Sequence, residues 1–521
     1  MRSHVNTLEQ ISNKQFSRRG FVAIAGTAVL ALSACGSPTG DPSTGDSAKL
    51  TIGILAAPRS LDPAQLDGGT QSYVWGAIYD TLVYYDNAGK LQPNAAESWE
   101  YSDDARTLTF TLRKGMKFST GAPVTADAVV ANLKRNKATP GQQQSKMSAV
   151  DSVEAPDANT VVVRFSTPDQ SFIYNMALEA GVIADPATVD ESRTPTNPVG
   201  SGPYVLDTSA TVNGSSYVLK RRDDYWNADA YPFATITVRV IADQAATMNA
   251  LRSGEIDASV VPASQVDSFS PTEFNVVSNS ASSAGYLNLA DREGTRLKPL
   301  GDVRVRQAIN MAFDREEIVD KLLAGAGSPT NQQFGRAGEA YDPELERLYE
   351  YNPQQAKKLL ADAGYPNGFS VNMPSTPMSL PFQPTISQAL GDIGIRVSWD
   401  PAPAQNATAS VAEGKYPMYF FLVGNDVAPR ELQRQFHSSS QNPFNWSSPE
   451  FERLEKEAHA ETDPDRRAEI FKELNAYVVE QALFAPIFFL HSTMVTTKDV
   501  KFLGDGTNGF PSIRTFGVAG G

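Results

Sequence analysis

The only cysteine of the 521-residue chain, Cys35, is the side chain with the clearest chemistry. It ends the run Leu32-Ser33-Ala34-Cys35, which matches a bacterial lipobox. In such a motif the cysteine sulfur takes a diacylglyceryl group and the chain is cut just before it, so a lipid anchors the mature protein. A single cysteine also excludes a disulfide within one molecule.

The residues before this cysteine predict a removable export signal. Arg18 and Arg19 supply a positive flank, and residues 20–34 form an apolar run too short to span a bilayer comfortably. The paired arginines resemble a twin-arginine export signal. We therefore predict a signal peptide of the twin-arginine type at 1–34 and a lipidated flexible tether at 35–48; an ordinary secretory signal and a membrane-anchor helix are the alternatives.

The rest of the chain lacks the usual catalytic and metal-binding motifs. His437, His459 and His491 are not spaced as a metal cluster. There is no Gly-x-Ser-x-Gly elbow, no His-Glu-x-x-His motif and no P-loop. We predict no catalytic residues, no cofactor and no bare metal site. A nickel chelate held by other groups, and an exported enzyme with dispersed carboxylates, stay open as alternatives.

Composition limits the classes of partner. The chain carries 45 basic and 59 acidic residues, a net charge of −14. Without residues 1–34 these counts become 41 and 58, a net charge near −17. Such a negative surface disfavours nucleic acid and anionic lipid. The length predicts two or three domains, and no second apolar run is long enough to span a membrane.

Helix and strand signals mix throughout, without a repeat of solenoid period, which predicts an α/β protein. Alternation of polar and apolar residues predicts a strand at residues 107–112, and strands are also predicted at residues 49–55, 160–165, 217–220, 235–241 and 395–399. Helical spacing and caps predict helices at residues 71–79, 125–134, 245–251, 302–324, 352–363, 384–393, 449–458 and 464–482.

Several short motifs follow one another in a specific order. They are Leu61-Asp62-Pro63, residues 91–99, residues 108–118 with Gly121, Val199 to Tyr204, Asp224-Tyr225-Trp226, residues 253–257, residues 303–308 with Asp314-Arg315-Glu316, and residues 356–360 through Gly364-Tyr365. In this order the chain resembles the family 5 extracytoplasmic solute-binding proteins, the peptide- and nickel-binding receptors of ABC importers. The resemblance covers nearly the whole mature chain.

The resemblance implies an α/β fold with two lobes, a clamshell like the type II periplasmic binding proteins, and an extra subdomain in the first lobe. Hinge strands are expected to cross near 284–290 and 488–497. The implied boundaries are lobe 1 at 49–85 and 199–285, its extra subdomain at 86–198, lobe 2 at 286–497, and a return to lobe 1 at 498–521.

The same resemblance implies a function. The chain is expected to be the substrate-binding subunit of an ABC importer, outside the cytoplasm and held to the cell membrane by its N-terminal lipid. It would capture an oligopeptide or related small solute between its lobes and deliver it to permease subunits that work with a cytoplasmic ATPase. It is expected to be a monomer, not an enzyme, with no nucleic acid partner. A solute sensor on the same fold is an alternative.

Candidate ligand contacts also come from the resemblance. Peptide receptors of the family place an Asp four residues before a Pro to pair with the peptide amine; the residue four before Pro429 is Asn425. Dipeptide receptors carry an Arg shortly after a Met-Pro pair, and none follows Met373-Pro374. These departures disfavour an ordinary free dipeptide. The expected ligand contacts are Tyr73, Tyr286, Asn288, Gly424, Asn425, Asp426 and Trp446.

Four other motif residues are expected to be structural. Trp99 and Trp226 are expected to fill core, because a buried indole contributes a large area. Arg304 and Arg306 are expected to pair with carboxylates.

Overall fold

The structure is a computed structural model. It describes residues 48–519 apart from 88, 337, 403–408, 439 and 505–508. Cys35, the signal peptide and nearly all of the tether lie outside the described residues and stay predictions.

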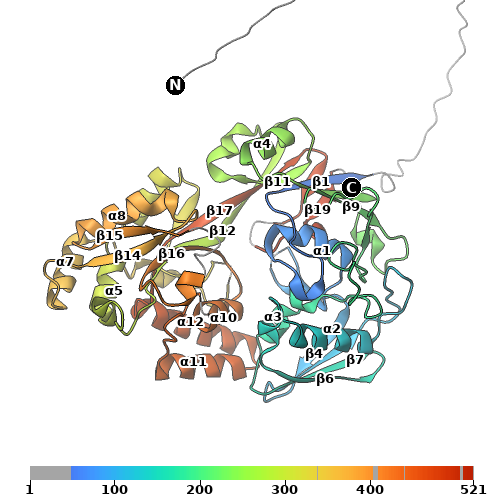
Figure 1. Ribbon diagram of the computed structural model, residues 1–521, viewed down its shortest axis with the longest axis horizontal. Helices are drawn as coiled ribbons and strands as arrows, with labels where there is room; N and C mark the ends of the chain where they lie inside the picture. The colour runs from blue at the N-terminus through green and yellow to red at the C-terminus, as the bar shows by residue number, and fades with distance from the viewer. Residues whose placement is uncertain are drawn as a thin grey trace, which may run out of the picture. The chain divides into compact units, whose positions relative to one another are not determined.

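One mixed sheet runs through both lobes (Figure 1). Its strands are β1 (Lys49–Ile54), β8 (Tyr204–Leu206), β9 (Ser216–Arg221), β10 (Thr235–Val240), β11 (Ala258–Pro262), β12 (Phe274–Asn288), β13 (Gly327–Pro329), β16 (Tyr419–Gly424) and β17 (Phe484–Thr497). Their order is β16-β12-β17-β11-β1-β10-β9-β8, with β13 paired to β17. β1 is parallel to β10 and β11, whereas β12 is antiparallel to β16 and β17.

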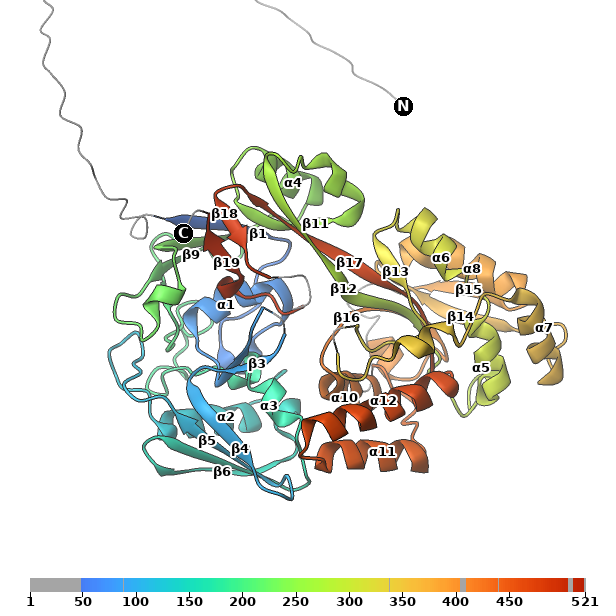
Figure 2. The ribbon, with the colours of Figure 1, turned by 180° about the vertical axis from the view of Figure 1, so that it is seen from behind.

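The long strands β12 and β17 connect the two lobes (Figure 2). They pair from Phe274 opposite Thr497 to Asn288 opposite Phe484, with a register shift beside Gly285. A side chain at Gly285 would place its Cβ 2.4 Å from the Phe488 ring, so glycine lets the strands cross closely. The predicted crossing at 488–497 lies within β17, and the one at 284–290 overlaps the last residues of β12 and extends two residues beyond it.

The extra subdomain of lobe 1 is a small antiparallel sheet covered by a helix. Its elements are β4 (Ala96–Tyr101), β5 (Thr107–Leu112), β6 (Val150–Asp157), β7 (Thr160–Phe165), α2 (Ala126–Ala138) and α3 (Phe172–Asn175), with the hairpin β2 (Val83–Tyr85) and β3 (Leu91–Pro93) beside them. Thr125 caps α2 by accepting from Ala128 N–H. Trp99 and Trp226 are half-buried against this core, as predicted.

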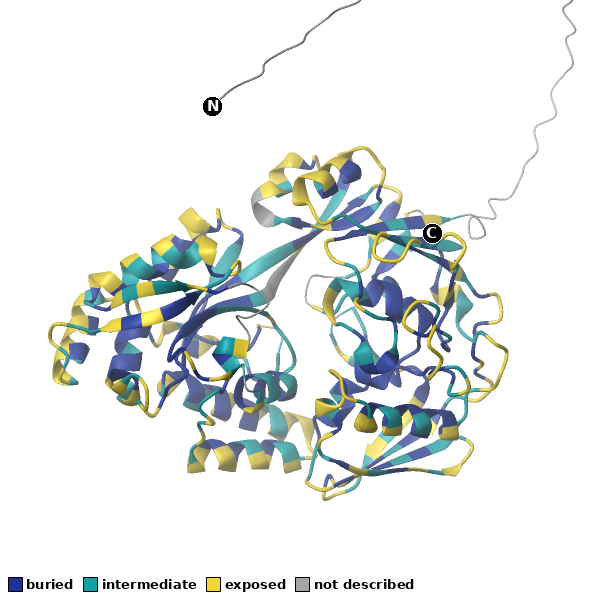
Figure 3. Ribbon diagram, viewed as in Figure 1, coloured by how far each residue is buried: buried dark blue, intermediate teal, exposed yellow. Residues whose placement is uncertain are grey.

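Lobe 2 is mostly helical. Its helices are α5 (Val303–Asn310), α6 (Arg315–Glu317), α7 (Pro353–Asp362), α8 (Gln383–Asp392), α10 (Ala428–His437), α11 (Pro449–Ala460) and α12 (Pro464–Glu480), beside the parallel pair β14 (Ser370–Ser375) and β15 (Arg396–Pro401). Figure 3 shows that the exposed residues of these helices lie on their outer faces, whereas the long strand β17 is mostly buried.

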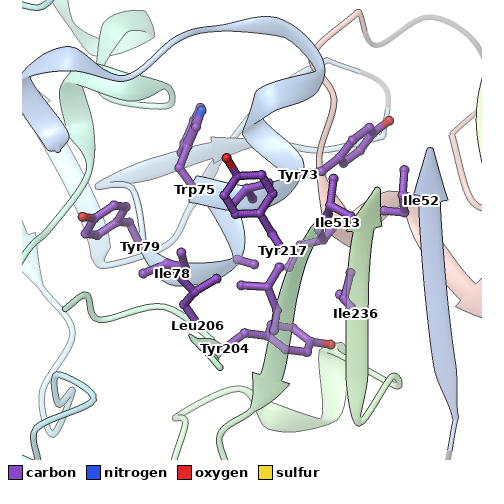
Figure 4. Close-up of a cluster of buried hydrophobic side chains, with 14 of the residues drawn as sticks. Ile52, Tyr73, Trp75, Ile78, Tyr79, Tyr204, Leu206, Tyr217, Ile236 and Ile513 are labelled. Atoms are coloured by element: carbon purple, nitrogen blue, oxygen red, sulfur yellow. The ribbon is translucent and has the colours of Figure 1, made fainter. Parts of the chain in front are cut away.

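The core of lobe 1 joins segments from both ends of the chain (Figure 4). Its remaining elements are α1 (Ser72–Ile78), α4 (Gln244–Arg252) and the pair β18 (Val500–Phe502) and β19 (Phe516–Val518). Tyr73 and Ile78 of α1 pack in one cluster with Ile52 from β1 and Ile513 from the C-terminal segment. The C-terminal segment therefore helps to hold α1 in place.

Most predicted elements are confirmed, but the single helix at 302–324 is wrong. It breaks after Asn310, and a new helix starts at Arg315 because Asp314 accepts from Glu317 N–H at 3.0 Å. The break turns the Arg315 side chain inward, where it donates to backbone carbonyls of β17 and its neighbours. A tertiary contact thus overrides the local helical pattern.

The two arginines expected to pair with carboxylates behave differently. Arg304 pairs with Asp302 at 2.6 Å, which confirms the prediction. For Arg306 the prediction is wrong, because its buried guanidinium donates to the backbone carbonyls of Gln481, Leu300 and Arg292. Burial lowers the pKa of Arg306 to about 10, and it serves as a structural connector.

His437 at the end of α10 gives a pH-dependent contribution to stability. Its Nε2 lies 2.6 Å from Glu455 Oε1, and this hydrogen bond raises the pKa of His437. A raised histidine pKa stabilises the fold below the unfolded pKa, and the gain is lost as pH rises through the folded value. Since 53% of the side chain is exposed, we expect His437→Gln to cost at most about 1 kcal/mol.

This cost should be present at about pH 5.5 and absent at about pH 8.5 in urea denaturation of both proteins. An equal cost at both pH values contradicts the ion pair. Glu461→Gln at the end of α11, whose carboxylate accepts from Asp463 N–H, is a control that leaves the histidine unchanged.

Candidate functional site

A cavity of about 80 Å³ lies in lobe 1, where the end of α1, the β2 hairpin and the C-terminal segment meet. We call it the lobe 1 chamber. The polar and aromatic side chains on its wall include Asp80, Tyr84, Asn94, Glu179, Tyr231 and Arg514. Its wall also contains Phe510, which stacks on Tyr85 at 4.4 Å between ring centroids. The chamber therefore combines aromatic surface with charged groups of both signs.

Arg514 is held over aromatic rings in this chamber. Its guanidinium carbon lies 4.2 Å from the centroid of the Tyr84 ring and 5.3 Å from that of Tyr231. Nη2 donates to Asn94 Oδ1 at 2.8 Å. Among the described residues, no carboxylate lies within the 4.0 Å of an ion pair with Arg514. Burial opposes its charge, but the surrounding tyrosines and Asp80 raise the pKa of Arg514, which stays cationic.

Asp80 follows α1 and is almost fully buried, with 2% of its surface exposed. Its Oδ1 accepts from the Tyr225 hydroxyl at 2.7 Å, and its backbone N–H donates to Ser201 Oγ at 3.2 Å. Its Oδ2 has no hydrogen-bond partner among the described residues. Burial raises the pKa of Asp80, although the Tyr225 hydrogen bond and the Arg514 charge work in the opposite direction.

Glu179 forms a charged pair on another part of the wall. It accepts from Lys146 Nζ at 2.9 Å. Burial opposes ionisation of Glu179, but the charges of Lys146 and Arg430 hold its pKa below the ordinary value. This carboxylate is therefore already neutralised by the protein.

The last residue of β16 and the loop that follows it hold three of the predicted ligand contacts. Gly424 is exposed, and Asn425 and Asp426 are half-buried. Asp426 Oδ2 accepts from Arg430 Nε at 2.9 Å, and Arg430 Nη1 donates to Asn175 Oδ1 of the lobe 1 subdomain at 3.1 Å. The loop thus reaches lobe 1, and the carboxylate of Asp426 is paired within the protein.

A second contact between the lobes comes from α12. Arg467 Nη1 donates to Gln170 Oε1 at 3.2 Å and Nη2 to the Tyr174 hydroxyl at 3.4 Å. Together with Arg430, this arginine joins lobe 2 to the segment around α3. Contacts of this kind restrain the separation of the lobes on this side of the hinge.

Tyr73 lies on α1 but not on the chamber wall. It is buried against Phe516, with ring centroids 5.7 Å apart. It lines a second, mostly apolar cavity of about 80 Å³, together with Phe502, Met494 and Val260. In Figure 4 Tyr73 is seen near Ile52 and Ile513, away from Tyr79.

The remaining predicted contacts lie in lobe 2. Tyr286 is buried and donates to Gln441 Oε1 at 2.9 Å, and Asn288 donates to the Gln441 carbonyl at 2.7 Å. Trp446 packs on Phe436 and Phe451, with ring centroids 6.0 and 5.7 Å apart. The structure therefore does not bring these three residues to the chamber, and their contact with ligand stays a prediction.

Sequence reasoning missed Asp80, Tyr84 and Arg514. Asp80 and Arg514 lie near opposite ends of the chain, and neither belongs to a motif with recognisable spacing. The available signal was weak: an arginine in the otherwise uncharged, aromatic-containing segment 509–518. Asp80 and Arg514 line one cavity only because the C-terminal segment folds back onto α1.

No helix among the described residues is long and apolar enough to cross a membrane. No group of three or more His, Cys, Asp or Glu side chains in the described part of the chain is arranged to hold a metal ion.

Comparison with known proteins identifies the class. The family described as "Bacterial extracellular solute-binding proteins, family 5 Middle" matches residues 90–444. Heme-binding protein A of Haemophilus influenzae is 26% identical over 480 residues, 83% of this chain and 85% of the relative. The dipeptide-binding protein of Pseudomonas aeruginosa is 24% identical over 537 residues, 93% of this chain and 97% of the relative.

A solved structure agrees with the fold. The PBP AgaA from A. tumefaciens R10, in complex with agropinic acid, has a TM-score of 0.75 and 26% identity, and the match covers 90% of this chain and 98% of AgaA. Two lobes joined by β12 and β17, with a charged chamber in one of them, define a periplasmic binding protein of the type II-like class. The chain belongs to the family 5 extracellular solute-binding proteins, the receptor subunits of ABC importers.

Proposed function

We propose that this chain is the lipid-anchored receptor of an ABC importer that captures an oligopeptide or related solute between its lobes and delivers it to a membrane permease. The observation that carries the proposal is the family match across residues 90–444. The relatives named as dipeptide-binding and heme-binding proteins support a small-solute cargo, and they favour import over catalysis.

The proposal includes the predicted anchor and partners. Cys35 would carry the lipid, and two acyl chains hold a protein stably at a membrane. The permease subunits and their cytoplasmic ATPase would receive cargo from a monomeric receptor. Cys35→Ser should release the protein from the cell envelope in a fractionation experiment, whereas a protein that stays attached contradicts the anchor.

Capture requires closure of the lobes over cargo. Closure excludes water and strengthens polar contacts inside the cleft. Native mass spectrometry of protein purified from its host should show a co-purified solute, and small-angle scattering should show a smaller radius with that solute than without it. Chemical conversion of the solute indicates an enzyme, and an unchanged radius contradicts closure.

The loop after β16 gives a prediction about peptide cargo. A neutral amide at Asn425 is a poorer partner for a peptide ammonium than a carboxylate, and Asp426 is already paired with Arg430. We expect Asn425→Asp to raise the affinity for free peptides about tenfold, because a hydrogen bond to a charged acceptor is stronger.

Isothermal titration with a free peptide and its N-acetylated form measures this effect. The gain should be confined to the free peptide. Asn367→Asp, in the segment of lobe 2 between α7 and β14, is the matched control. No gain for the free peptide means that this loop does not meet the peptide amine.

A further inference from the structure

The protein uses few of the donors of Arg514, which is half-buried, whereas it uses every guanidinium nitrogen of the buried Arg315. Arg315 makes five hydrogen bonds, four of them to backbone carbonyls. The Arg514 guanidinium makes one, to Asn94. Its stacking on Tyr84 and Tyr231 fixes the plane of the group and leaves donor edges for another acceptor. A held, planar guanidinium of this kind binds carboxylates in a bidentate manner.

Asp80 offers the complementary group in the same chamber. A buried carboxylate oxygen without a partner costs free energy unless a donor reaches it. Oδ2 of Asp80 is such an oxygen, since it has no hydrogen-bond partner among the described residues. Asp80 is 2% exposed and lines the chamber. Among the described residues of this wall the other carboxylate is Glu179, which is paired with Lys146. The chamber thus presents one acceptor and one cation that the protein leaves uncommitted.

The size of the chamber limits what enters it. A volume of about 80 Å³ exceeds the roughly 30 Å³ that one water molecule occupies in the liquid. It admits a headgroup of a few non-hydrogen atoms, and the rest of a larger solute must extend outside. Because the cationic Arg514 and the carboxylate of Asp80 line the same chamber, they favour a ligand group that carries both a negative and a positive charge.

We propose that the lobe 1 chamber is a subsite for an α-amino-acid headgroup, with its carboxylate on Arg514 and its ammonium on Asp80. This inference rests on the proposed function, since it names the class of solute. Suitable solutes carry a free amine and a free carboxylate on one carbon, as in a side-chain-linked glutamyl peptide.

Two isomeric dipeptides test this directly. γ-Glutamylalanine has amine and carboxylate on one carbon, whereas α-glutamylalanine, with the same composition and charge, does not. Titration calorimetry on the mature chain should show the γ-isomer binding at least about tenfold more tightly. Arg514→Gln and Asp80→Asn should each weaken the γ-isomer by about 10- to 100-fold and abolish the preference.

Matched controls separate binding from folding. Arg113→Gln removes an arginine that stacks on Trp226 at 4.1 Å in the same lobe, and Asp185→Asn removes a buried carboxylate that accepts from Thr120; neither residue lines the chamber. Both controls should keep the isomer preference. Because burial raises the pKa of Asp80, its ionised form costs stability above that pKa, so Asp80→Asn should not lower the melting temperature at neutral pH.

The results that overturn the subsite differ from the results that overturn the proposed receptor function. Equal affinity for the two isomers, no binding of either, or a preference that survives Arg514→Gln overturns the subsite. Each of these results is compatible with a receptor that closes on another co-purified solute. Loss of the preference in the Arg113→Gln control also overturns it, because the effect then belongs to the fold of lobe 1.

Discussion

Replacing Arg315 with methionine should lower the free energy of unfolding by about 3–5 kcal/mol. Arg315 is 6% exposed, and its guanidinium donates to the carbonyls of Thr330, Pro486, Asn310 and Tyr349. Methionine fills similar space but leaves these buried acceptors without donors, which costs more than a typical hydrogen bond contributes. Burial already lowers the pKa of Arg315 to about 10, so removal of the buried charge returns part of this cost.

Urea denaturation of the ligand-free protein measures the difference. Arg304→Met is the matched control, because Arg304 belongs to the same motif region but has a 45% exposed side chain paired with Asp302. Its loss should be a small fraction of that for Arg315→Met, since exposed pairs are screened by water and salt. Similar losses for the two variants would show that the inward carbonyl contacts of Arg315 contribute little.

The sequence predicted the elements of this fold well where the signal was local. Strands at residues 107–112 and 160–165 have the predicted limits, because alternation of buried and exposed positions sets both ends. Helix α10 was missed, although Pro429 stands in its first turn, since the preceding loop was read by resemblance alone. Arg306 was misread because its carbonyl partners come from segments that are distant in sequence.

The candidate site was harder to predict for a related reason. Asp80 and Arg514 meet only because β18 and β19 bring the end of the chain back onto α1. No periodicity or motif in the sequence predicts that the C-terminal segment packs on α1. Tyr286 and Asn288 alternate with apolar neighbours on a strand. This pattern is equally compatible with side chains that face a ligand and with side chains that form buried hydrogen bonds. In the structure both side chains donate to Gln441, which comes from a distant segment.

Gly202→Ala should lower the free energy of unfolding by about 3 kcal/mol, because the new methyl group has no space. A Cβ at Gly202 would lie 2.5 Å from the carbonyl carbon of Ile78 and 2.7 Å from Tyr79 N, both backbone atoms. Gly202 N–H also donates to the Ile78 carbonyl at 2.8 Å, which holds the two segments together. Asp80 follows directly, so the same displacement should weaken any solute held in the chamber.

Thermal and urea unfolding with and without cargo separate the two effects. Gly391→Ala near the end of α8 is the matched control, because a Cβ there meets nothing within 4 Å. Alanine in a helix is favoured over glycine, so this control should be neutral or gain up to about 1 kcal/mol. If Gly202→Ala is as stable as the control, the backbone near Ile78 yields to a methyl group. The position of Asp80 is then set by its bonds to Tyr225 and Ser201 and not by close packing at Gly202.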